Sequence, residues 1–374
     1  MTQTHDHSGP ESPVLDFLRD NGARRAGGYG DAPDFFGPAR TEDGDGSSPD
    51  TCTRCEVGYE FRSGMWERVV VRNAAPFRPD DPLTPRRFVD GKDVGRVVAY
   101  VASPAGFPVP VRLSQVGAVA LRAVPGIGEA LALRVESRRV EKVVSLMGDL
   151  FPWDEIERFA AGLHACGFRL LIARRAGPED DFRNVAWLQE NVRYRTREEM
   201  FRMERRAISA RCEGQASPVT IADGRLDDKE EAVRGDAPLV GLVKTQASTS
   251  YLHDEGWAIL YALRPGERTP ALALKTEKLE LVTWYVRLTG GGGGPLDGLV
   301  RVELPRGFFE AKVGKDFGYL DRLSHALCSW RTRDAGYGRS GVTLHPIQQA
   351  EERLGAHLLP TDTLVSRFYK ISGL

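Results

Sequence analysis

Runs of apolar and β-branched residues typical of β-strands occur in two blocks along this sequence, and segments with helical spacing follow each block. A chain in which strand blocks and helix blocks follow one another is typical of an α/β or α+β layered domain, whose helices cover a mixed sheet. No internal repeat of solenoid period is present. The predicted strands cover residues 88–90, 95–102, 116–124, 168–173, 219–222, 239–244, 257–263, 280–288 and 299–304, and the predicted helices cover residues 129–150, 154–163, 184–210, 320–330 and 347–358.

Two of the predicted strands end in the same way, on an aspartate followed by glycine. Asp223 closes the run Val-Thr-Ile-Ala-Asp-Gly, and Asp90 closes the run Arg-Phe-Val-Asp-Gly far upstream. Glycine lets the chain turn where an apolar strand stops, so each carboxylate is expected at the end of a strand. Two such carboxylates suit a divalent-metal site, because hard cations prefer carboxylate oxygens.

A third carboxylate is expected on the helix predicted at 184–210. Met200, Glu204 and Ile208 recur at intervals of four residues, so Glu204 lies in the apolar stripe that should face the sheet. A carboxylate aimed inward is costly unless it is paired or bound to a cation. For an isolated glutamate a buried ion pair with arginine is the simpler interpretation, whereas two strand-end aspartates nearby favour a shared cation.

The C-terminal part adds Tyr337 and His345. Pro346 suits the first turn of a helix, so His345 is expected at a helix start, where its imidazole would act as a ligand or carry a proton. A histidine beside carboxylates favours manganese over magnesium. The alternative is that His345 and Tyr337 are packed side chains without a chemical role.

The composition limits the class of protein. The chain has 374 residues, a net charge of −1 and 41% hydrophobic residues, which allows a large core but gives no overall basic field. Its five cysteines, an odd number, favour a reducing compartment. No signal peptide and no apolar run of transmembrane length are recognised, so a soluble cytoplasmic protein without a membrane partner is expected.

The sequence divides into an arm and a domain. Residues 1–50 are rich in glycine, aspartate, serine and proline and predict a disordered arm, because they cannot bury enough apolar surface. Residues 51–374 are expected to form one domain. Cys52 and Cys55 have the spacing of half a zinc site, but no second pair lies near, and free thiols are favoured. The glycines of 124–132 resemble a DNA-binding turn, although a helix-capping loop is the simpler interpretation.

Positive charges of two kinds are candidates for contacts with phosphate. Lys244 ends the strand next to that of Asp223 and suits a contact with a scissile phosphate, or else lies solvated at the strand end. Arginines on the helix at 184–210 would bind a nucleic-acid backbone, or would be balanced by glutamates through i, i+4 pairs. These arginines are Arg193, Arg195, Arg197, Arg202, Arg205 and Arg206.

Six motifs occur in an order that resembles the NurA nuclease family, the partner of the HerA hexameric DNA translocase. The resemblance runs from about residue 86 to the C-terminus and is clearest over 200–350. The motifs are the Asp90-Gly strand end, Arg202-x-Glu204, the Val-Thr-Ile-Ala-Asp-Gly-Arg-Leu run of 219–226, the Leu-Val-Gly-Leu-Val-Lys run of 239–244, the Gly-Leu-Val-Arg-Val-Glu-Leu run of 298–304, and Tyr337 with His345.

The resemblance implies an RNase H-like fold, with an insertion around 125–185, and a manganese-dependent DNA nuclease with exonuclease and endonuclease activity. It also implies a homodimer that works with a HerA-like ATPase in DNA end processing or in defence against phage. Asp90, Glu204 and Asp223 match the family's catalytic carboxylates, and Tyr337 and His345 match its C-terminal pair. Lys92 and Arg225 stand where the family has small residues, which leaves Asp93 as an alternative to Asp90.

The sequence therefore predicts hydrolysis of phosphodiester bonds at a site holding one or two Mn²⁺ ions, with Mg²⁺ as the other candidate. Asp90, Glu204, Asp223 and His345 are the expected ligands, and Lys244, Arg202, Arg205 and Arg206 the expected DNA contacts. The competing hypothesis is a catalytically silent RNase H-like subunit that binds DNA or serves as a scaffold in a translocase complex.

Overall fold

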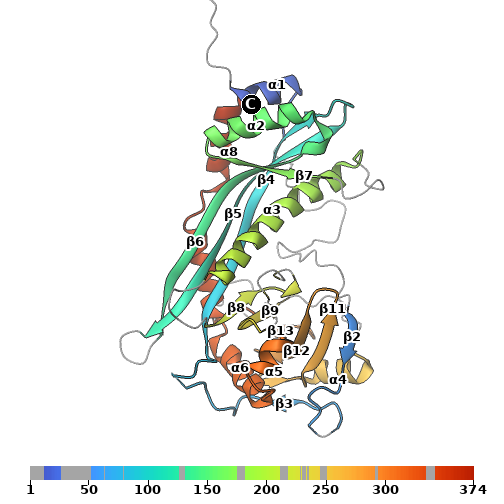
Figure 1. Cartoon of the computed structure of the whole chain (residues 1–374), viewed down its shortest axis with the longest axis vertical. Coiled ribbons are helices and arrows are strands. Elements are labelled where there is room, and N and C mark those ends of the chain that lie inside the picture. Colours follow the sequence, from blue (N-terminus) through green and yellow to red (C-terminus); the bar gives the residue numbers. More distant parts are fainter. Residues whose placement is uncertain are drawn as a thin grey trace, which may run out of the picture.

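The computed structural model of this protein is an elongated molecule built on one large mixed sheet (Figure 1). The described residues are 12–26, 52–62, 64–78, 80–125, 131–174, 182–210, 218–227, 229, 233, 236–244, 251–290, 294–333 and 342–374. The strands are β1 (Arg24–Arg25), β2 (Cys52–Glu56), β3 (Val69–Val70), β4 (Pro85–Ala102), β5 (Pro108–Pro125), β6 (Leu131–Met147), β7 (Arg169–Ala173), β8 (Val219–Asp223), β9 (Leu239–Val243), β10 (Glu267–Arg268), β11 (Leu272–Thr276), β12 (Glu280–Arg287) and β13 (Leu299–Pro305). The helices are α1 (Pro13–Asp20), the 3₁₀ turn η1 (Gly148–Leu150), α2 (Trp153–Ala165), α3 (Val185–Ser209), α4 (Asp254–Ala262), α5 (Arg306–Ala311), α6 (Phe317–Trp330), α7 (His345–Gly355) and α8 (Thr361–Ser372).

The strand order of the sheet is β2-β11-β12-β13-β9-β8-β4-β5-β6-β7. Strands β4, β8 and β9 run parallel to one another, as do β6 and β7, and the remaining neighbours along this path are antiparallel. At the centre, three antiparallel strands, β6, β5 and β4, therefore continue into two strands parallel to β4. The mixed α/β sheet flanked by helices that the sequence predicts is confirmed.

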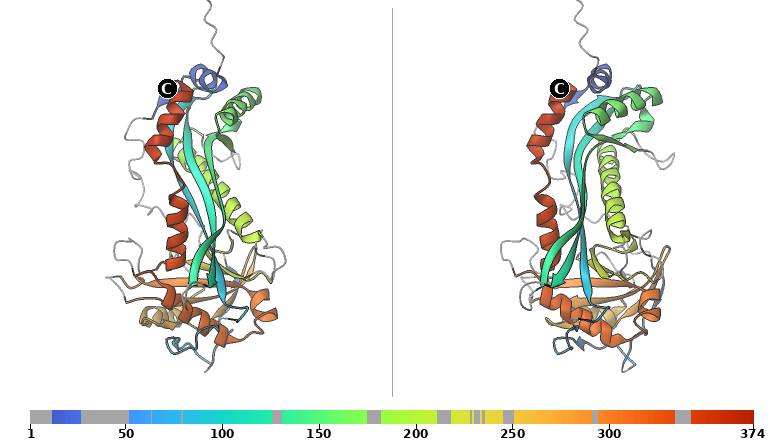
Figure 2. Two further views of the ribbon diagram at one scale, coloured as in Figure 1. Left: turned by 90° about the vertical axis from the view of Figure 1, so that its left-hand side faces the viewer. Right: turned by 60° about the vertical axis from the view of Figure 1, so that its left-hand side comes forward.

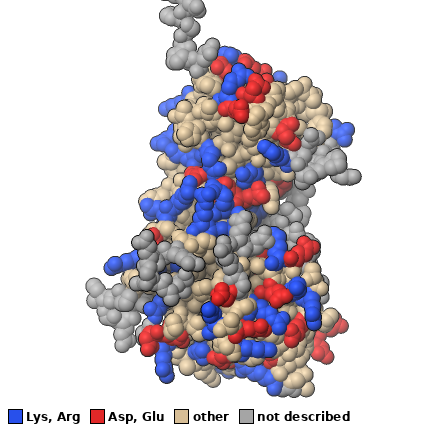
Figure 3. Space-filling view, in the orientation of Figure 1, with Lys and Arg blue, Asp and Glu red and all other residues tan. Residues whose placement is uncertain are grey.

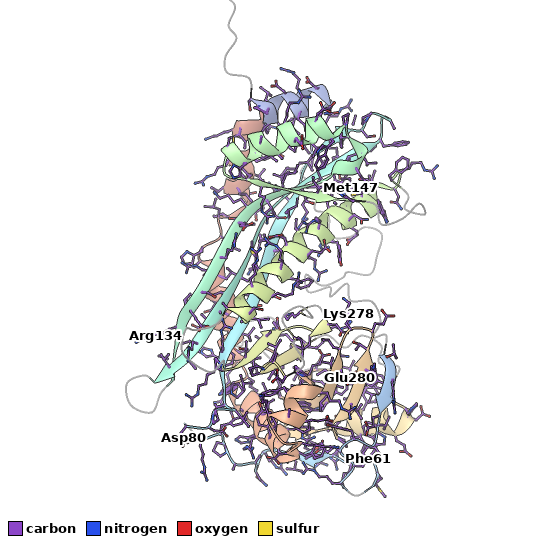
Figure 4. All side chains as sticks on the ribbon, in the orientation of Figure 1. Phe61, Asp80, Arg134, Met147, Lys278 and Glu280 are labelled. Carbon is purple, nitrogen blue, oxygen red and sulfur yellow. The ribbon has the colours of Figure 1, made fainter. Side chains whose placement is uncertain are left out.

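Long strands give the molecule its elongated shape. β4 and β5 each contain 18 residues and β6 contains 17, and together they rise from the lower part of the molecule to its upper end (Figure 1). Arg134 and Met147 mark the two ends of β6 in Figure 4. In Figure 2, helix α3 covers one face of these strands, and the red helices α7 and α8 cover the other. The central strands are thus covered on both sides.

The largest cores lie at the two ends of the molecule. In the lower part, apolar residues of β8, β9, β12 and β13 pack against α5, α6 and α7, with Trp284 and Phe309 fully buried. In the upper part, β4, β5 and β6 pack against α1, α2 and α8, with Phe159 and Phe368 fully buried. A site between these cores is held by rigid elements on both sides.

The helix predicted at 129–150 is wrong, because residues 131–147 form β6. Val143 packs toward Met203 of α3 on one face of the sheet, and the adjacent Val144 packs in the upper core on the other. A strand covered on both faces carries apolar residues without alternation. The valines of β6 therefore recur at intervals that are also typical of a helix.

The strand predicted at 257–263 is also wrong, since Asp254–Ala262 is helix α4. Asp254 and Glu255 in its first turn favour a helix start.

Helix α8 has no counterpart among the helices that the sequence predicts. Helix α2 begins at Trp153, one residue before the predicted start, with Pro152 as its N-cap. The two strands predicted at 88–90 and 95–102 are one continuous strand, β4.

Part of the predicted N-terminal arm belongs to the fold. Residues Pro13–Asp20 form α1, whose Val14 and Leu18 are fully buried against α2 and α8. Residues Arg24–Arg25 add a short strand to β4. The prediction of disorder is therefore wrong for 12–26, and the rest of the arm lies outside the described residues. The described part of the expected insertion is continuous with the sheet, because β6 and β7 are strands of that sheet.

Two weaker sequence hypotheses have less support. The centre of the glycine-rich turn, 126–130, lies outside the described residues, and the segment before it is strand β5. Cys55 is a free thiol, and no set of three or more histidine, cysteine, aspartate or glutamate residues arranged to hold a metal occurs in the part of the chain that the structure describes. None of the described helices is long and apolar enough to span a membrane.

Candidate carboxylate site

Asp90 lies within β4, beside the parallel strand β8. Val89 of β4 pairs with Ala222, the residue before Asp223, so the two aspartates lie on neighbouring strands close to the same level. Asp90 alternates with Phe88, which packs in the core that contains Ile347 and Ala350 of α7. The Asp90 side chain therefore points to the α7 face of the sheet, where it is 6% exposed.

Asp223 ends β8, and Gly224 turns the chain there with a φ of +84°. This left-handed conformation favours glycine, which explains the Asp-Gly pair. The Lys244 ammonium donates a hydrogen bond of 2.9 Å to Asp223 Oδ2. Asp223 Oδ1 is buried, and none of the described residues forms a hydrogen bond with it. A buried carboxylate oxygen in that state is available to a cation.

Glu204 approaches the same strands from α3, on the other face of the sheet. It is 3% exposed, which confirms the predicted inward orientation, and its Oε2 lies 3.2 Å from the ammonium of Lys229. Among the described residues the ion-pair partner of Glu204 is therefore Lys229. A Cβ on Gly91 would lie 2.4 Å from Glu204 Oε1. Glu204 therefore reaches β4 at the residue after Asp90, where the strand has no side chain.

These carboxylates influence one another. Burial raises the pKa of Asp90 well above its ordinary value, and the charges of Asp223, Glu204 and Glu351 raise it further, whereas Lys244 lowers it. Buried like charges favour protonation of one member of the group unless a cation compensates for them. The group is therefore an anionic centre with two lysines beside it.

The alternative candidate, Asp93, is placed elsewhere. Its Oδ2 accepts a hydrogen bond of 2.5 Å from Thr196 Oγ1 of α3, and Arg112 lies 3.9 Å from the same oxygen. Alternation along β4 directs Asp93 to the α3 face, away from the α7 face where Asp90 lies. The structure thus groups Asp90 with Asp223 and gives Asp93 a role in packing α3.

The donor set suits a hard divalent cation, because it offers carboxylate oxygens, among them Asp223 Oδ1, which accepts no hydrogen bond from the described residues. The three carboxylates do not yet converge as ligands, in agreement with the absence of a preformed ligand set among the described residues. Lys244 holds one oxygen of Asp223 and Lys229 contacts one of Glu204. A cation would be offered Asp223 Oδ1, while Oδ2 stays on Lys244.

The C-terminal candidates are less closely tied to this centre. His345 is the first residue of α7, as predicted, but its side chain is exposed. Tyr337 lies outside the described residues. The α7 residue that contributes to the electrostatics of Asp90 is Glu351, whose Oε1 lies 3.1 Å from Lys92 Nζ. Glu351 stands six residues beyond His345, about 9 Å along the helix axis.

Sequence reasoning missed Glu351 and Lys229. Lys92 was the available signal for Glu351, because a lysine two residues after Asp90 on the same strand face requires a counter-charge. The signal for Lys229 was weak, since it follows two aspartates in a polar segment. Only the folded chain brings Lys229 against Glu204, where its side chain is 1% exposed.

Positive side chains gather across the middle of the view in Figure 3, where α3 and β6 lie in Figure 1. Several arginines of α3 have acidic partners: Arg193 with Glu190, Arg195 with Glu198, and Arg202 with Glu199. These pairs are all spaced i, i+3 rather than the predicted i, i+4, and they balance this part of the helix face. Arg205 is half-buried and Arg206 exposed.

Fold and site together define an α/β protein with a buried and a partly buried carboxylate on adjacent parallel strands and a third carboxylate on a covering helix. Residues 179–337 match the family model of the NurA domain. The match supports the assignment of this chain to the NurA nuclease family, and it indicates a nuclease. It includes Glu204, Asp223 and Lys244, and Asp90 and His345 lie outside it. No protein of curated function matches the sequence.

Proposed function

We propose that this protein is a divalent-metal-dependent deoxyribonuclease that hydrolyses phosphodiester bonds as an exonuclease and endonuclease. The observation that carries the proposal is the meeting of Asp90 and Asp223 on adjacent parallel strands, with Glu204 reaching β4 at Gly91. The NurA domain match over 179–337 supports the same reaction class.

In this proposal Asp90 and Asp223 hold the ion, and Glu204 would have to reach it from the α3 face past Gly91, which has no side chain. A bound Mn²⁺ or Mg²⁺ supplies an activated water and stabilises negative charge on the attacking and leaving oxygens. Lys244, whose ammonium contacts Asp223 Oδ2, would stand beside the scissile phosphate as a point charge. His345 and Tyr337 remain proposed as the proton carrier and the group that orients the phosphate or the water.

The DNA partner is expected to contact the α3 side of the molecule. Arg202, Arg205 and Arg206 lie on that helix, and phosphate contacts by arginine are independent of base sequence. Partial pairing with glutamates on α3 leaves a binding surface with a moderate field, and the affinity for DNA should fall with added salt.

The larger assembly follows from the same family. We propose an RNase H-like core formed by β6, β5, β4, β8 and β9, because three antiparallel strands there continue into two strands parallel to the first. We also propose a homodimer in the cytoplasm that works with a HerA-like hexameric ATPase in DNA end processing or anti-phage defence. The NurA match supports these assignments.

A second candidate function is a catalytically silent DNA-binding or scaffold subunit. Two lysines already contact Asp223 and Glu204, and ammonium groups in those places would stabilise the fold without any metal. The two candidates differ in one respect: only the nuclease requires Asp223 to bind a cation.

Cleavage of linear DNA in the presence of Mn²⁺ separates them. Asp223→Ala should reduce cleavage by more than about 100-fold, since loss of even an outer-shell partner of a metal costs roughly 10–100-fold. Asp236→Ala is the matched control, because Asp236 is an exposed carboxylate paired with Lys312. Equal activity of Asp223→Ala and wild type, or no activity in either with the cognate ATPase present, would leave the silent subunit as the better assignment.

A further inference from the structure

Glu303 is a buried carboxylate without a role in the proposed reaction. It lies on β13, and its neighbours Val302 and Leu304 pack in the core that contains residues of α7. Alternation along the strand therefore directs Glu303 to the face of the sheet opposite α7. Asp223 alternates with Ile221 of that core, so its side chain lies on the α7 face. Glu303 is thus on the other side of the sheet from a ligand held by the Asp223 side chain.

A hydrogen bond connects Glu303 to the turn that follows Asp223. Glu303 Oε2 accepts this bond from the backbone amide of Leu226, at 2.8 Å, and Leu226 is fully buried. The amide of Gly224 donates a hydrogen bond of 2.9 Å to the carbonyl of Leu242 in β9, which fixes the start of the same turn. A buried amide without an acceptor is costly, so these two acceptors determine where the turn can lie.

The register of the sheet explains how a residue of β13 reaches a turn beyond β8. Glu303 pairs with Gly241 of β9, and Gly241 pairs with Ala222 of β8. The three residues form one row across β13, β9 and β8, which are neighbours in the sheet (Figure 1). A Cβ on Gly241 would lie 3.0 Å from Leu226 Cγ and 3.1 Å from the carbonyl oxygen of Gly224. The glycine therefore leaves room for the turn to fold back over β9 toward the carboxylate.

Arg301 holds the carboxylate of Glu303 itself. Its guanidinium lies 2.8 Å from Glu303 Oε1 and donates a hydrogen bond of 3.1 Å to the hydroxyl of Tyr251. The hydroxyl of Tyr251 lies 3.0 Å from that of Tyr285. One oxygen of Glu303 thus contacts the arginine, and the other accepts the bond from the turn. A buried polar network in which each carboxylate oxygen has a partner is rigid.

We propose that Glu303 is a positioning residue for Asp223, on which it acts through the Leu226 amide and the turn of residues 223–226. This inference rests on the proposed metal-dependent nuclease function, and it adds a residue from the opposite face of the sheet to the groups on which the reaction depends. A displacement of about 1 Å in a reacting group can cost roughly 100-fold in rate, so the position of the turn affects catalysis.

Two full-length double variants test the proposal, because they differ in a hydrogen-bond acceptor. Arg301→Met with Glu303→Gln keeps a side-chain oxygen for the Leu226 amide, whereas Arg301→Met with Glu303→Met removes it. Both variants lack the buried ion pair, so the loss of that pair is common to them. Mn²⁺-dependent cleavage of linear DNA and the hydrogen exchange of residues 223–226 are measured for both variants and for wild type.

The second variant should have a kcat roughly 10–100-fold below that of the first, with a KM for DNA changed by less than about twofold, because a displaced Asp223 affects the reaction and not the contacts with the DNA backbone. Its Leu226 amide should also exchange faster, since its acceptor is gone. A role of Glu303 confined to stability would leave the two folded variants with the same kcat.

The outcomes separate this inference from the function on which it rests. Equal kcat values of the two folded variants would overturn the role of Glu303 and leave the nuclease intact. Failure of wild type to cleave DNA with Mn²⁺ and the cognate ATPase would overturn the nuclease function and this inference with it.

If the second variant does not fold, Gly241→Ala decides. Its new Cβ would press on the turn at Leu226 and Gly224, and Glu303 would keep its own side chain. A loss in kcat of roughly tenfold or more, with KM for DNA unchanged, supports the proposal, whereas a folded variant with the kcat of wild type overturns it. Gly355→Ala is the control, because nothing lies within 4 Å of a Cβ at that position.

Discussion

Gly91 determines whether Glu204 can take part in the site. The residue belongs to β4, the strand that carries Asp90, and faces the helix that carries Glu204, so a Cβ there would lie 2.4 Å from Glu204 Oε1. Its φ is not positive, so backbone conformation does not require glycine at this position. Close approach of a side chain is the reason for glycine here, whereas the conformation of the turn is the reason at Gly224.

Gly91→Ala should displace the Glu204 carboxylate and reduce Mn²⁺-dependent cleavage by at least about tenfold, with a loss of unfolding free energy of about 1–3 kcal/mol from overpacking. Chemical denaturation and a cleavage assay measure the two effects. Gly355→Ala is the control, because nothing lies within 4 Å of a Cβ at Gly355. Wild-type cleavage by Gly91→Ala would show that the orientation of Glu204 does not matter.

The candidate site was partly predictable residue by residue. Asp223 and Asp90 could be predicted because an apolar strand that ends on Asp-Gly is a local pattern. Glu204 could be predicted because helical spacing fixes the face on which it lies. Lys229 and Glu351 were not predicted, because their contacts with the site join segments separated by 25 residues and more, and the only local sign was Lys92.

At the scale of single elements, burial of the sheet on both faces explains why β6 was predicted as a helix. The central strands carry valines in adjacent positions because α3 covers one face of the sheet and α7 and α8 cover the other. Period-2 alternation, the usual sign of a strand, disappears under those conditions. Strands in the lower part, such as β8 and β9, were predicted correctly because each is a short apolar run bounded by turn residues.

Helix α1 is an ordered element in a segment that was predicted to be disordered. Its eight residues contain Val14, Phe17 and Leu18 on one face, and the ring of Phe17 stacks on that of Phe159 of α2 at 4.3 Å. The flanking segments dominate the composition and conceal this short amphipathic helix. Its stability comes from docking, since isolated helices of this length are marginal in water.

Leu18→Ala should therefore lower the unfolding free energy by about 2–5 kcal/mol, the usual cost of removing a buried leucine side chain. Thermal and urea denaturation measure the change. Leu15→Ala on the same helix is the control with a smaller effect, because Leu15 is 37% exposed. Equal stabilities of wild type and Leu18→Ala would mean that α1 does not dock on α2 and α8.

At the scale of the whole molecule, a buried ionic network joins distant segments of the lower part. The guanidinium of Arg268 is 0% exposed and contacts Glu60 and Asp321, which belong to the segment after β2 and to α6. Glu60 also accepts a hydrogen bond of 2.6 Å from the backbone amide of Ala271. The network fixes the edge of the sheet against α6, on the side away from the long strands.

Arg268→Met should destabilise the protein by about 3–5 kcal/mol, because the change leaves Glu60 and Asp321 without their buried counter-charge. Lys275→Met removes an exposed ion pair with Glu280 and should cost at most about 1 kcal/mol. Denaturant titrations of both variants provide the comparison. A loss for Arg268→Met no larger than that of the control would show that the network does not join these segments.

The sequence by itself determined the α/β class, the strand-end aspartates and the inward face of Glu204, because these depend on local turn chemistry and on the period of a single element. Only the tertiary structure decided that β6 is a strand, that Asp90 rather than Asp93 stands beside Asp223, and that Lys229 neutralises Glu204. The physical reason is that burial on two faces and pairing of charges are properties of contacts between distant segments, which no local pattern records.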